Sequence, residues 1–292
     1  MERARSHLLV FGLGYSGGAI AAAAARSGFA VTGTSRDPSR VRVPAGVDAI
    51  AFAAAEHSIA PATHIIATVP PDESGDPVLE RYGEAIANAA HVRWAGYLST
   101  TGVYGDRRGA WVDEDSEPSP GSPRTQRRLA AERAWSRLGQ RVAVDLFRLA
   151  GIYGPGRSVF GSLRAGTARR IVKPGHRFGR IHRDDIAEAA LAAMQQERGA
   201  GVRILNLADD EPAESALVIE EAARLLGMDS PPEIPFKEAA SEMSPMARGF
   251  WAESRQVASR KTRAVLGIRW RYPSYREGLR ATLVEERGEG PP

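Results

Sequence analysis

A glycine pattern near the start of the chain fixes much of its fold. Gly12, Gly14 and Gly17 form the spacing G-x-G-x-x-G. The pattern directly follows an apolar run, His7–Phe11, and precedes a run of small residues, Ala19–Gly28, typical of a helix that ends at glycine. A strand, a glycine turn and a helix in this order predict a nucleotide-binding unit, because bare glycines and a helix amino end admit a pyrophosphate.

Strand-like and helix-like segments then alternate along the chain. Further strands are expected at residues 29–36, 47–52, 64–71, 94–100, 142–151 and 203–208, with helices at residues 77–90, 124–138 and 184–196. Such alternation predicts an α/β fold, a doubly wound parallel Rossmann sheet with a smaller helix-rich C-terminal lobe. We expect residues 1–155 and 184–208 to form the dinucleotide-binding domain, and residues 156–183 and 209–292 to form the lobe.

Composition excludes several other classes of protein. The 292 residues are 43% hydrophobic and 25% charged, as in a globular chain with a sizeable core. No apolar run reaches about 18 residues, so a transmembrane helix is not expected. Glycines interrupt the first apolar stretch, which argues against a signal peptide. The absence of cysteine excludes disulfides, thiolate metal sites and a cysteine nucleophile, and a cytoplasmic location fits these features best.

The charge is only slightly basic, at 39 basic against 35 acidic side chains. Much of the excess is arginine scattered through helical segments, which indicates solvated helix faces rather than a nucleic-acid surface. The expected partner is therefore a small-molecule substrate, with no nucleic acid and no membrane. The histidines at four positions show no metal-ligand spacing, so no metal site is expected: His7, His57, His64 and His91.

The end of the second expected strand indicates which dinucleotide binds. An NAD site normally carries an acidic residue there, which bonds the ribose hydroxyls. This chain has Ser35 and Arg36, and a guanidinium suits a 2′-phosphate, so NADP is favoured over NAD. Asp37 stays open as an alternative ribose ligand. The cofactor residues predicted at this end of the sheet are Gly12, Gly14, Tyr15, Ser16, Gly17, Ser35, Arg36 and Thr68.

Four segments in order resemble those of a known family. They are STTGVYGD (Ser99–Asp106), FRLAGIYGPGRS (Phe147–Ser158), RIHRDDIAEA (Arg180–Ala189) and NLADDEP (Asn206–Pro212). Together they are similar to segments of the extended short-chain dehydrogenase/reductases, a group of NAD(P)-dependent epimerases, dehydratases and reductases. The glycine spacing and the VPP that ends the fourth strand look like the atypical YeeZ-like branch. The resemblance implies a Rossmann sheet with a small substrate lobe.

The resemblance also implies a catalytic set of Ser or Thr, Tyr and Lys. Thr100 matches the hydroxyl position. Aligned on the sequence LAAE, Arg124 stands where the tyrosine belongs and Arg128 where the lysine belongs. Arginine stays protonated at any working pH, so neither residue can exchange a proton with a substrate. Arg128 can still hold the cofactor ribose, which needs only a fixed donor.

Other candidate groups have simpler explanations. Tyr104 and Tyr153 lie in GVYG and GIYG turns, where aromatic packing is expected. His182 is the one neutral-pH base near the expected junction of sheet and lobe, and a structural histidine is the simpler interpretation. Asp185 with Glu188 has the spacing of a helix capping box. An exposed turn accounts for the acidic residues at positions 113–115.

Two functions remain open from the sequence. The first is an NADP-dependent oxidoreductase or epimerase that acts on a small polar or sugar-like substrate with a non-standard active site. The second is a catalytically degenerate dinucleotide-binding sensor or partner-binding module. Members of the family that the sequence resembles often form dimers through the long helices after the fourth and fifth strands. The resemblance therefore implies a possible homodimer.

Overall fold

A parallel sheet of seven strands forms the centre of the computed structural model, which describes residues 6–288. Its strands run, from one edge to the other, β11 (Gly201–Leu207), β7 (Ala143–Leu149), β5 (Trp94–Thr100), β4 (His64–Ala67), β1 (His7–Phe11), β2 (Ala30–Ser35) and β3 (Val47–Ala51). Every neighbouring pair is parallel. The strand order reverses beside β1, which is where open α/β sheets bind their ligands. The predicted doubly wound α/β fold is confirmed.

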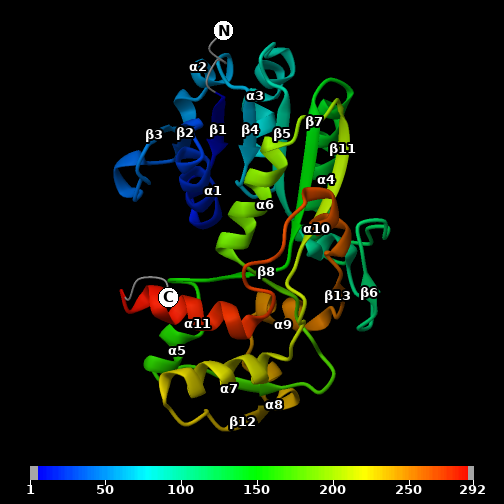
Figure 1. Ribbon diagram of the computed structural model, residues 1–292. Helices are drawn as coiled ribbons and strands as arrows, with labels where there is room; N and C mark the ends of the chain where they lie inside the picture. Colours follow the sequence, from blue (N-terminus) through cyan, green and yellow to red (C-terminus); the bar gives the residue numbers. More distant parts are fainter. Residues whose placement is uncertain (1–5, 289–292) are drawn as a thin grey trace.

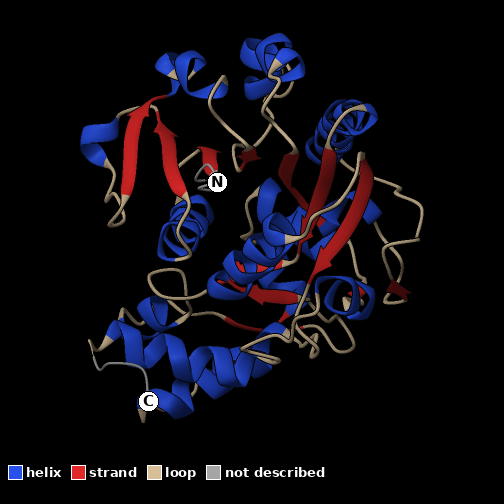
Figure 2. Cartoon of the chain, turned by 45° about the horizontal axis from the view of Figure 1, so that its top comes forward, coloured by secondary structure: helices blue, strands red, loops and turns tan. Residues whose placement is uncertain are grey.

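Helices cover both faces of this sheet (Figures 1 and 2). One face carries α1 (Tyr15–Arg26) and α6 (Arg183–Gln195), and the other carries α3 (Pro77–Asn88) and α4 (Pro123–Ser136), with the short α2 (Glu56–Ile59) beside α3. Two separate apolar clusters, one on each face, bury the strands, as continuous apolar runs predict for a parallel sheet.

The long helices that follow the fourth and fifth strands of the chain are α3 and α4. A homodimer that pairs through these two helices stays a prediction.

The second part of the molecule lies at the carboxyl ends of the strands (Figure 1). It contains the strand pairs β8 (Gly151–Tyr153) with β10 (Arg180–His182) and β9 (Arg170–Val172) with β12 (Glu233–Pro235). Its helices are α5 (Phe160–Arg164), α7 (Ser215–Leu226), α8 (Phe236–Ser241), α9 (Pro245–Ala252) and α11 (Tyr275–Glu286). A further strand pair joins β6 (Trp111–Val112) with β13 (Gln256–Val257). Helix α10 (Arg260–Leu266) follows β13 in the chain and packs on β11 and α6.

The amino ends of two helices differ from the sequence prediction. Helix α1 begins at Tyr15 rather than at Ala19, so the last glycine of the loop already belongs to the helix. The capping box predicted for Asp185 is wrong. The His182 ring caps α6 instead, accepting a hydrogen bond from the Asp184 amide. The Asp185 carboxylate is buried and accepts the amides of Arg271 (2.7 Å) and Tyr272 (3.2 Å), which fastens the C-terminal segment to α6.

Helix length and polarity bear on membrane insertion. Within residues 6–288, no helix is both long enough and apolar enough to cross a bilayer.

Candidate functional site

The glycine loop is fixed to the second strand of the sheet. Gly12 has a φ of +102°, a conformation that favours glycine. Its amide donates to the Thr34 hydroxyl (3.1 Å), and the Leu13 amide donates to the Thr34 carbonyl (2.7 Å). The tight turn that the sequence predicts at this glycine is therefore held by two hydrogen bonds that its amides donate to Thr34 of β2.

The other two glycines of the pattern have different roles. A Cβ atom on Gly17 would lie 1.9 Å from the Gly12 carbonyl oxygen, so only glycine lets α1 approach the turn this closely. A Cβ atom on Gly14 would have no neighbour within 4 Å. Gly14 is exposed and precedes the first turn of α1, whose free amides point out of the helix end. Open space in front of a helix amino end fits a pyrophosphate.

Three further side chains at the loop, those of Thr68, Ser16 and Tyr15, have different surroundings. The Thr68 hydroxyl donates to the carbonyls of Gly12 (2.7 Å) and Phe11 (3.2 Å), which ties the end of β4 to the loop. Ser16 is buried within α1. The Tyr15 ring lies close to two guanidinium groups, those of Arg157 and Arg183, at 5.7 and 5.4 Å from its centre. Burial raises the pKa of Tyr15 to about 12, so its hydroxyl stays protonated.

The end of β2 leaves a cation facing solvent. Arg36 is exposed, and no hydrogen bond or ion pair joins its side chain to another residue among those the structure describes. Asp37 has a local task, because its carboxylate accepts the amide (3.1 Å) and hydroxyl (2.6 Å) of Ser39. The Ser35 hydroxyl lies 3.2 Å from the Asp37 carbonyl, and this geometry leaves Arg36 as the uncommitted group at the strand end.

The three predicted catalytic residues lie where β5 meets α4. Thr100 ends β5, and its hydroxyl accepts the Gly102 amide at 3.1 Å. The Arg128 guanidinium donates through Nη1 to the Tyr97 hydroxyl (3.0 Å) and the Leu98 carbonyl (2.8 Å), so it lies against the same strand. Arg124 lies in the first turn of α4 and is exposed. Arg128 is thus bound within the fold, whereas the Arg124 side chain has no hydrogen bond or ion pair within residues 6–288.

A buried polar network behind Thr100 was not predicted. Arg148 forms an ion pair with Glu132 (2.8 Å), and both side chains are almost fully buried. Ser99 donates to the same carboxylate, and the Arg148 guanidinium lies 4.7 Å from the centre of the Tyr104 ring. The Tyr104 hydroxyl donates to Asn206 at 2.8 Å. The network joins β5, α4, β7 and β11 and so fixes the strand end that carries Thr100.

His182 and Tyr153 form part of the junction between sheet and lobe. The two rings meet edge to face at 5.2 Å, and His182 Nε2 lies 3.3 Å from the Thr282 hydroxyl. Burial lowers the pKa of His182 to about 4, so the ring is neutral at working pH. Burial also raises the pKa of Tyr153 and of Tyr104. These contacts agree with the structural roles expected for all three residues.

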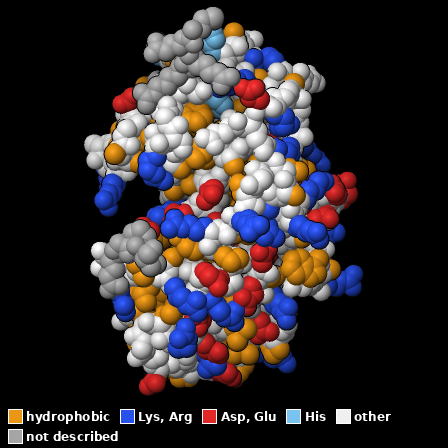
Figure 3. Space-filling model, viewed as in Figure 1, with side chains coloured by type: hydrophobic (Ala, Val, Ile, Leu, Met, Phe, Trp, Pro, Cys, Tyr) orange, Lys and Arg blue, Asp and Glu red, His pale blue; other side chains and the backbone are white. Residues whose placement is uncertain are grey.

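A cavity of about 230 Å³ lies between β8, β10 and the lobe helices α7 and α11. Its walls are mostly aromatic and aliphatic, and two arginines, Arg157 and Arg180, also line it. Figure 3 shows Lys and Arg side chains gathered in a band across the middle of this face, at the level where sheet and lobe meet. The cavity therefore combines apolar walls with two cationic side chains.

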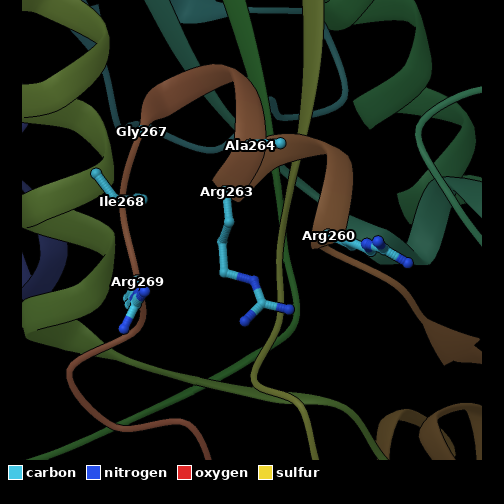
Figure 4. Close-up of a pocket in the computed structure, with 6 residues that line it drawn as sticks. All are labelled: Arg260, Arg263, Ala264, Gly267, Ile268 and Arg269. Carbon is cyan, nitrogen blue, oxygen red and sulfur yellow. The ribbon is translucent and has the colours of Figure 1, made fainter.

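A second, shallower groove lies on the surface beside α10 (Figure 4). Arg263 points along it and pairs with Asp210 (2.7 Å), whereas Arg260 points away from it.

Close by, Glu114 differs from the exposed turn that the sequence predicts. Its carboxylate is buried and accepts the Thr262 amide at 3.1 Å, so it anchors the start of α10. Among residues 6–288, no group of three or more acidic, histidine or cysteine side chains is placed to hold a metal.

No family model matches the chain, but individual proteins do. It is 42% identical to a conserved protein of unknown function from Silicibacter pomeroyi, whose structure matches with a TM-score of 0.89 over 96% of this chain and 99% of that one. A 3-diazoavenalumate denitrifying reductase from a Streptomyces species is 30% identical over 187 residues. That match spans 58% of this chain and 58% of the reductase. Protein YeeZ of Escherichia coli K12 is 28% identical over 242 residues, 76% of this chain and 84% of YeeZ.

Solved structures at lower identity share the fold. The human epimerase family protein SDR39U1, solved with NADPH, has a TM-score of 0.71 at 18% identity and covers 94% of this chain and 98% of its own. MoeE5, solved with UDP-glucuronic acid and NAD, has a TM-score of 0.74 at 20% identity and covers 98% and 100%. These structures share the doubly wound Rossmann fold of this chain. Together with the glycine loop and the similarity to YeeZ, they fit the resemblance of the sequence to the atypical extended short-chain dehydrogenase/reductases.

Proposed function

We propose that this protein is an NADPH-dependent oxidoreductase that acts on a small polar substrate between the sheet and the lobe. One observation carries the proposal. The open space at Gly14, in front of the α1 amino end, shares the carboxyl edge of the sheet with an uncommitted Arg36. The loop accounts for a pyrophosphate, and the arginine accounts for a 2′-phosphate. An epimerase would use the same cofactor site, but the named Streptomyces relative is a reductase.

The preference for NADPH rests on this chain rather than on its neighbours. The human neighbour was solved with NADPH and MoeE5 with NAD, so the fold admits both cofactors. Here the acidic candidate Asp37 already binds Ser39, and Arg36 has no competing partner among the described residues. A guanidinium binds a phosphate monoester through paired hydrogen bonds, which an unphosphorylated ribose cannot offer.

Bound NADPH would supply a hydride, and the arginines would act on charge rather than on protons. Arg124 and Arg128 lie one helical turn apart on α4 and share a face. A fixed guanidinium stabilises negative charge that develops on a substrate oxygen, and it also binds an acidic group. Arg128 keeps nitrogens beyond Nη1 for the cofactor ribose. Neither arginine delivers a proton, so the best substrates take theirs from water or need none.

The second candidate is a dinucleotide-binding sensor without catalysis. The observation in its favour is the engagement of Arg128, whose Nη1 bonds to Tyr97 and Leu98 fix α4 to β5 as a structural arginine would. Binding of NADPH without turnover of any carbonyl, nucleotide-sugar or carboxylate compound would favour this candidate over the oxidoreductase.

Calorimetric titration with NADPH and NADH tests the cofactor assignment. Arg36→Ala should weaken NADPH binding by about ten- to a hundredfold, the effect of losing a charge-assisted hydrogen bond of about 1.5–3 kcal/mol, and leave NADH binding unchanged. Arg26→Ala is the matched control, because it removes the same charge from the far end of α1. Equal losses for both cofactors in Arg36→Ala would assign Arg36 a structural role and refute the preference.

A further inference from the structure

We propose that the cavity between β8, β10 and the lobe helices binds a small aromatic carboxylate, and that Arg180 holds the carboxylate group. This inference rests on the proposed function, because it names the class of substrate that the oxidoreductase takes. Four observations carry it: the size of the cavity, the aromatic rings along its wall, the free donors of Arg180 and the position of the cavity beside the glycine loop.

The size of the cavity sets the size of the ligand. An apolar cavity of about 150 Å³ holds one benzene ring. The cavity here measures about 230 Å³, which leaves room for one ring and a short side arm. Pockets for larger organic ligands span about 300–1,000 Å³. A nucleotide sugar carries two rings and a diphosphate, so it exceeds this space.

Aromatic rings line the cavity and favour a flat ligand. The Phe178 and Phe250 rings stack in parallel, with centres 4.5 Å apart and planes inclined by 7°. Phe250 is nevertheless 59% exposed, unusual for a large apolar side chain that already stacks. Tyr275 contributes a third ring to the lining. A planar ring that enters the cavity extends this stack and covers apolar surface that water now meets.

Arg180 supplies the charge. Its Nη1 donates to the carbonyls of Phe178 (2.9 Å) and Ala213 (3.0 Å), so the guanidinium is held in one orientation. Its Nε and Nη2 have no hydrogen-bond partner among the described residues, and this pair of donors matches the two oxygens of a carboxylate. Because two anchored carbonyls fix the group in advance, binding costs little side-chain entropy.

Asp209 is the acidic residue whose charge acts most strongly on Arg180. Asp209 is 2% exposed, and neither of its carboxylate oxygens has a hydrogen-bond partner among residues 6–288. Burial raises the pKa of Asp209 well above its ordinary value, although Arg180 acts against this shift. No ion pair joins Asp209 to Arg180 among the described residues, so the two free donors of Arg180 stay open to an anionic ligand.

The cavity lies next to the proposed cofactor site. Arg157 lines it, and the same guanidinium lies over the ring of Tyr15, which belongs to the glycine pattern and is the first residue of α1. Gly151, which also lines the cavity, follows the carboxyl end of β7. A ligand in this space therefore sits between the pyrophosphate loop and the strand ends, as a substrate of a dinucleotide enzyme must.

Calorimetry with trans-cinnamate and its uncharged amide, cinnamamide, tests the inference on the full chain saturated with NADPH. Cinnamate should bind at least tenfold more tightly than cinnamamide, and Arg180→Gln should remove that difference. The matched control is Arg170→Gln, an arginine of the same lobe that pairs with Glu220 and Glu233 and does not line the cavity. This control should keep the preference for the acid.

A second variant covers a failure of Arg180→Gln to fold. Phe250 is exposed, so Phe250→Ala should leave the fold intact and weaken cinnamate and cinnamamide by the same factor. Equal affinity of the wild type for acid and amide, or unchanged cinnamate binding in Phe250→Ala, would overturn the inference. The proposed function can fail independently of this inference. If the wild type binds cinnamate but not NADPH, the oxidoreductase proposal is refuted and the cavity assignment stands. If the wild type binds NADPH but not cinnamate, only the cavity assignment is refuted.

Discussion

The Thr68 hydroxyl donates a 2.7 Å hydrogen bond to the Gly12 carbonyl, across the gap between β4 and the first turn of the glycine loop. Thr68 therefore need not touch a cofactor to affect its binding. The bond fixes the carbonyl of Gly12, and the Cβ position of Gly17 is only 1.9 Å from that same oxygen. Strand end, turn and helix start form one rigid unit, and the free amides of α1 point from it.

Thr68→Val should weaken NADPH binding by about three- to tenfold, because one hydrogen bond of about 0.5–1.5 kcal/mol no longer positions the loop. Thr63→Val is the matched control. Its hydroxyl also bonds to a backbone carbonyl, that of His7 (3.0 Å), but at the opposite end of the sheet. Calorimetry should show unchanged affinity in Thr63→Val, and equal affinity in both variants would contradict the positioning role of Thr68.

Two glycines of the loop should separate binding from stability. Gly14→Val places its side chain in the open space reserved for the pyrophosphate, so it should abolish NADPH binding at an unchanged melting temperature. Gly17→Ala forces a methyl group into the Gly12 carbonyl, so it should lower the melting temperature markedly. Calorimetry and thermal unfolding of both variants check the pair. Normal NADPH affinity in a folded Gly14→Val would show that the phosphate binds elsewhere.

Much of this site follows from local sequence, and the rest depends on contacts between distant segments. Glycine spacing after an apolar run predicts the turn at Gly12. An arginine directly after the second predicted strand likewise predicts a cation at this strand end, which is the exposed Arg36. Nothing local predicts the Glu132–Arg148 ion pair, because LAAE and DLFRL each read as ordinary helix and strand. Asp185 misled for the same reason: its spacing matches a capping box, but packing of the C-terminal segment supplies different partners.

The stability of the fold should depend on pH through His182. Its folded pKa, about 4, lies below the ordinary value of 6.5, so the unfolded chain binds a proton in this range that the folded chain does not. Stability from this group is therefore complete above pH 6.5 and is lost as the pH falls to 4, by about 3 kcal/mol. Asp185, whose pKa burial raises to about 6, acts in the opposite direction and offsets part of this loss.

His182→Asn keeps an acceptor for the Asp184 amide and removes the titration. Urea unfolding between pH 4 and 7 should show a smaller loss of unfolding free energy at low pH than in the wild type. His57→Asn, at an exposed position, is the control and should leave the wild-type pH profile unchanged. An identical profile in the His182 variant would mean that this ring is not the titrating group.

The arginines of α4 allow a direct test of the non-standard active site. We expect wild-type protein to show little or no hydride transfer to carbonyl substrates of the kind that related epimerases and reductases use. A carbonyl that accepts a hydride needs a proton at its oxygen, and a positioned donor accelerates this step by about 10²–10⁴-fold. Arg124→Tyr with Arg128→Lys restores such a donor and its partner. Because Arg124 is exposed, the tyrosine meets no packed core.

Single-turnover oxidation of NADPH should become faster in this double variant, while NADPH affinity stays near that of the wild type. The effect should depend on where the tyrosine stands, so Arg133→Tyr, in the last turn of the same helix, is the control and should leave the rate unchanged. The opposite pattern is equally informative. Brisk wild-type turnover that disappears in the double variant would show that the two guanidinium groups themselves stabilise the reacting substrate, and that proton delivery by a tyrosine is not what this site lacks.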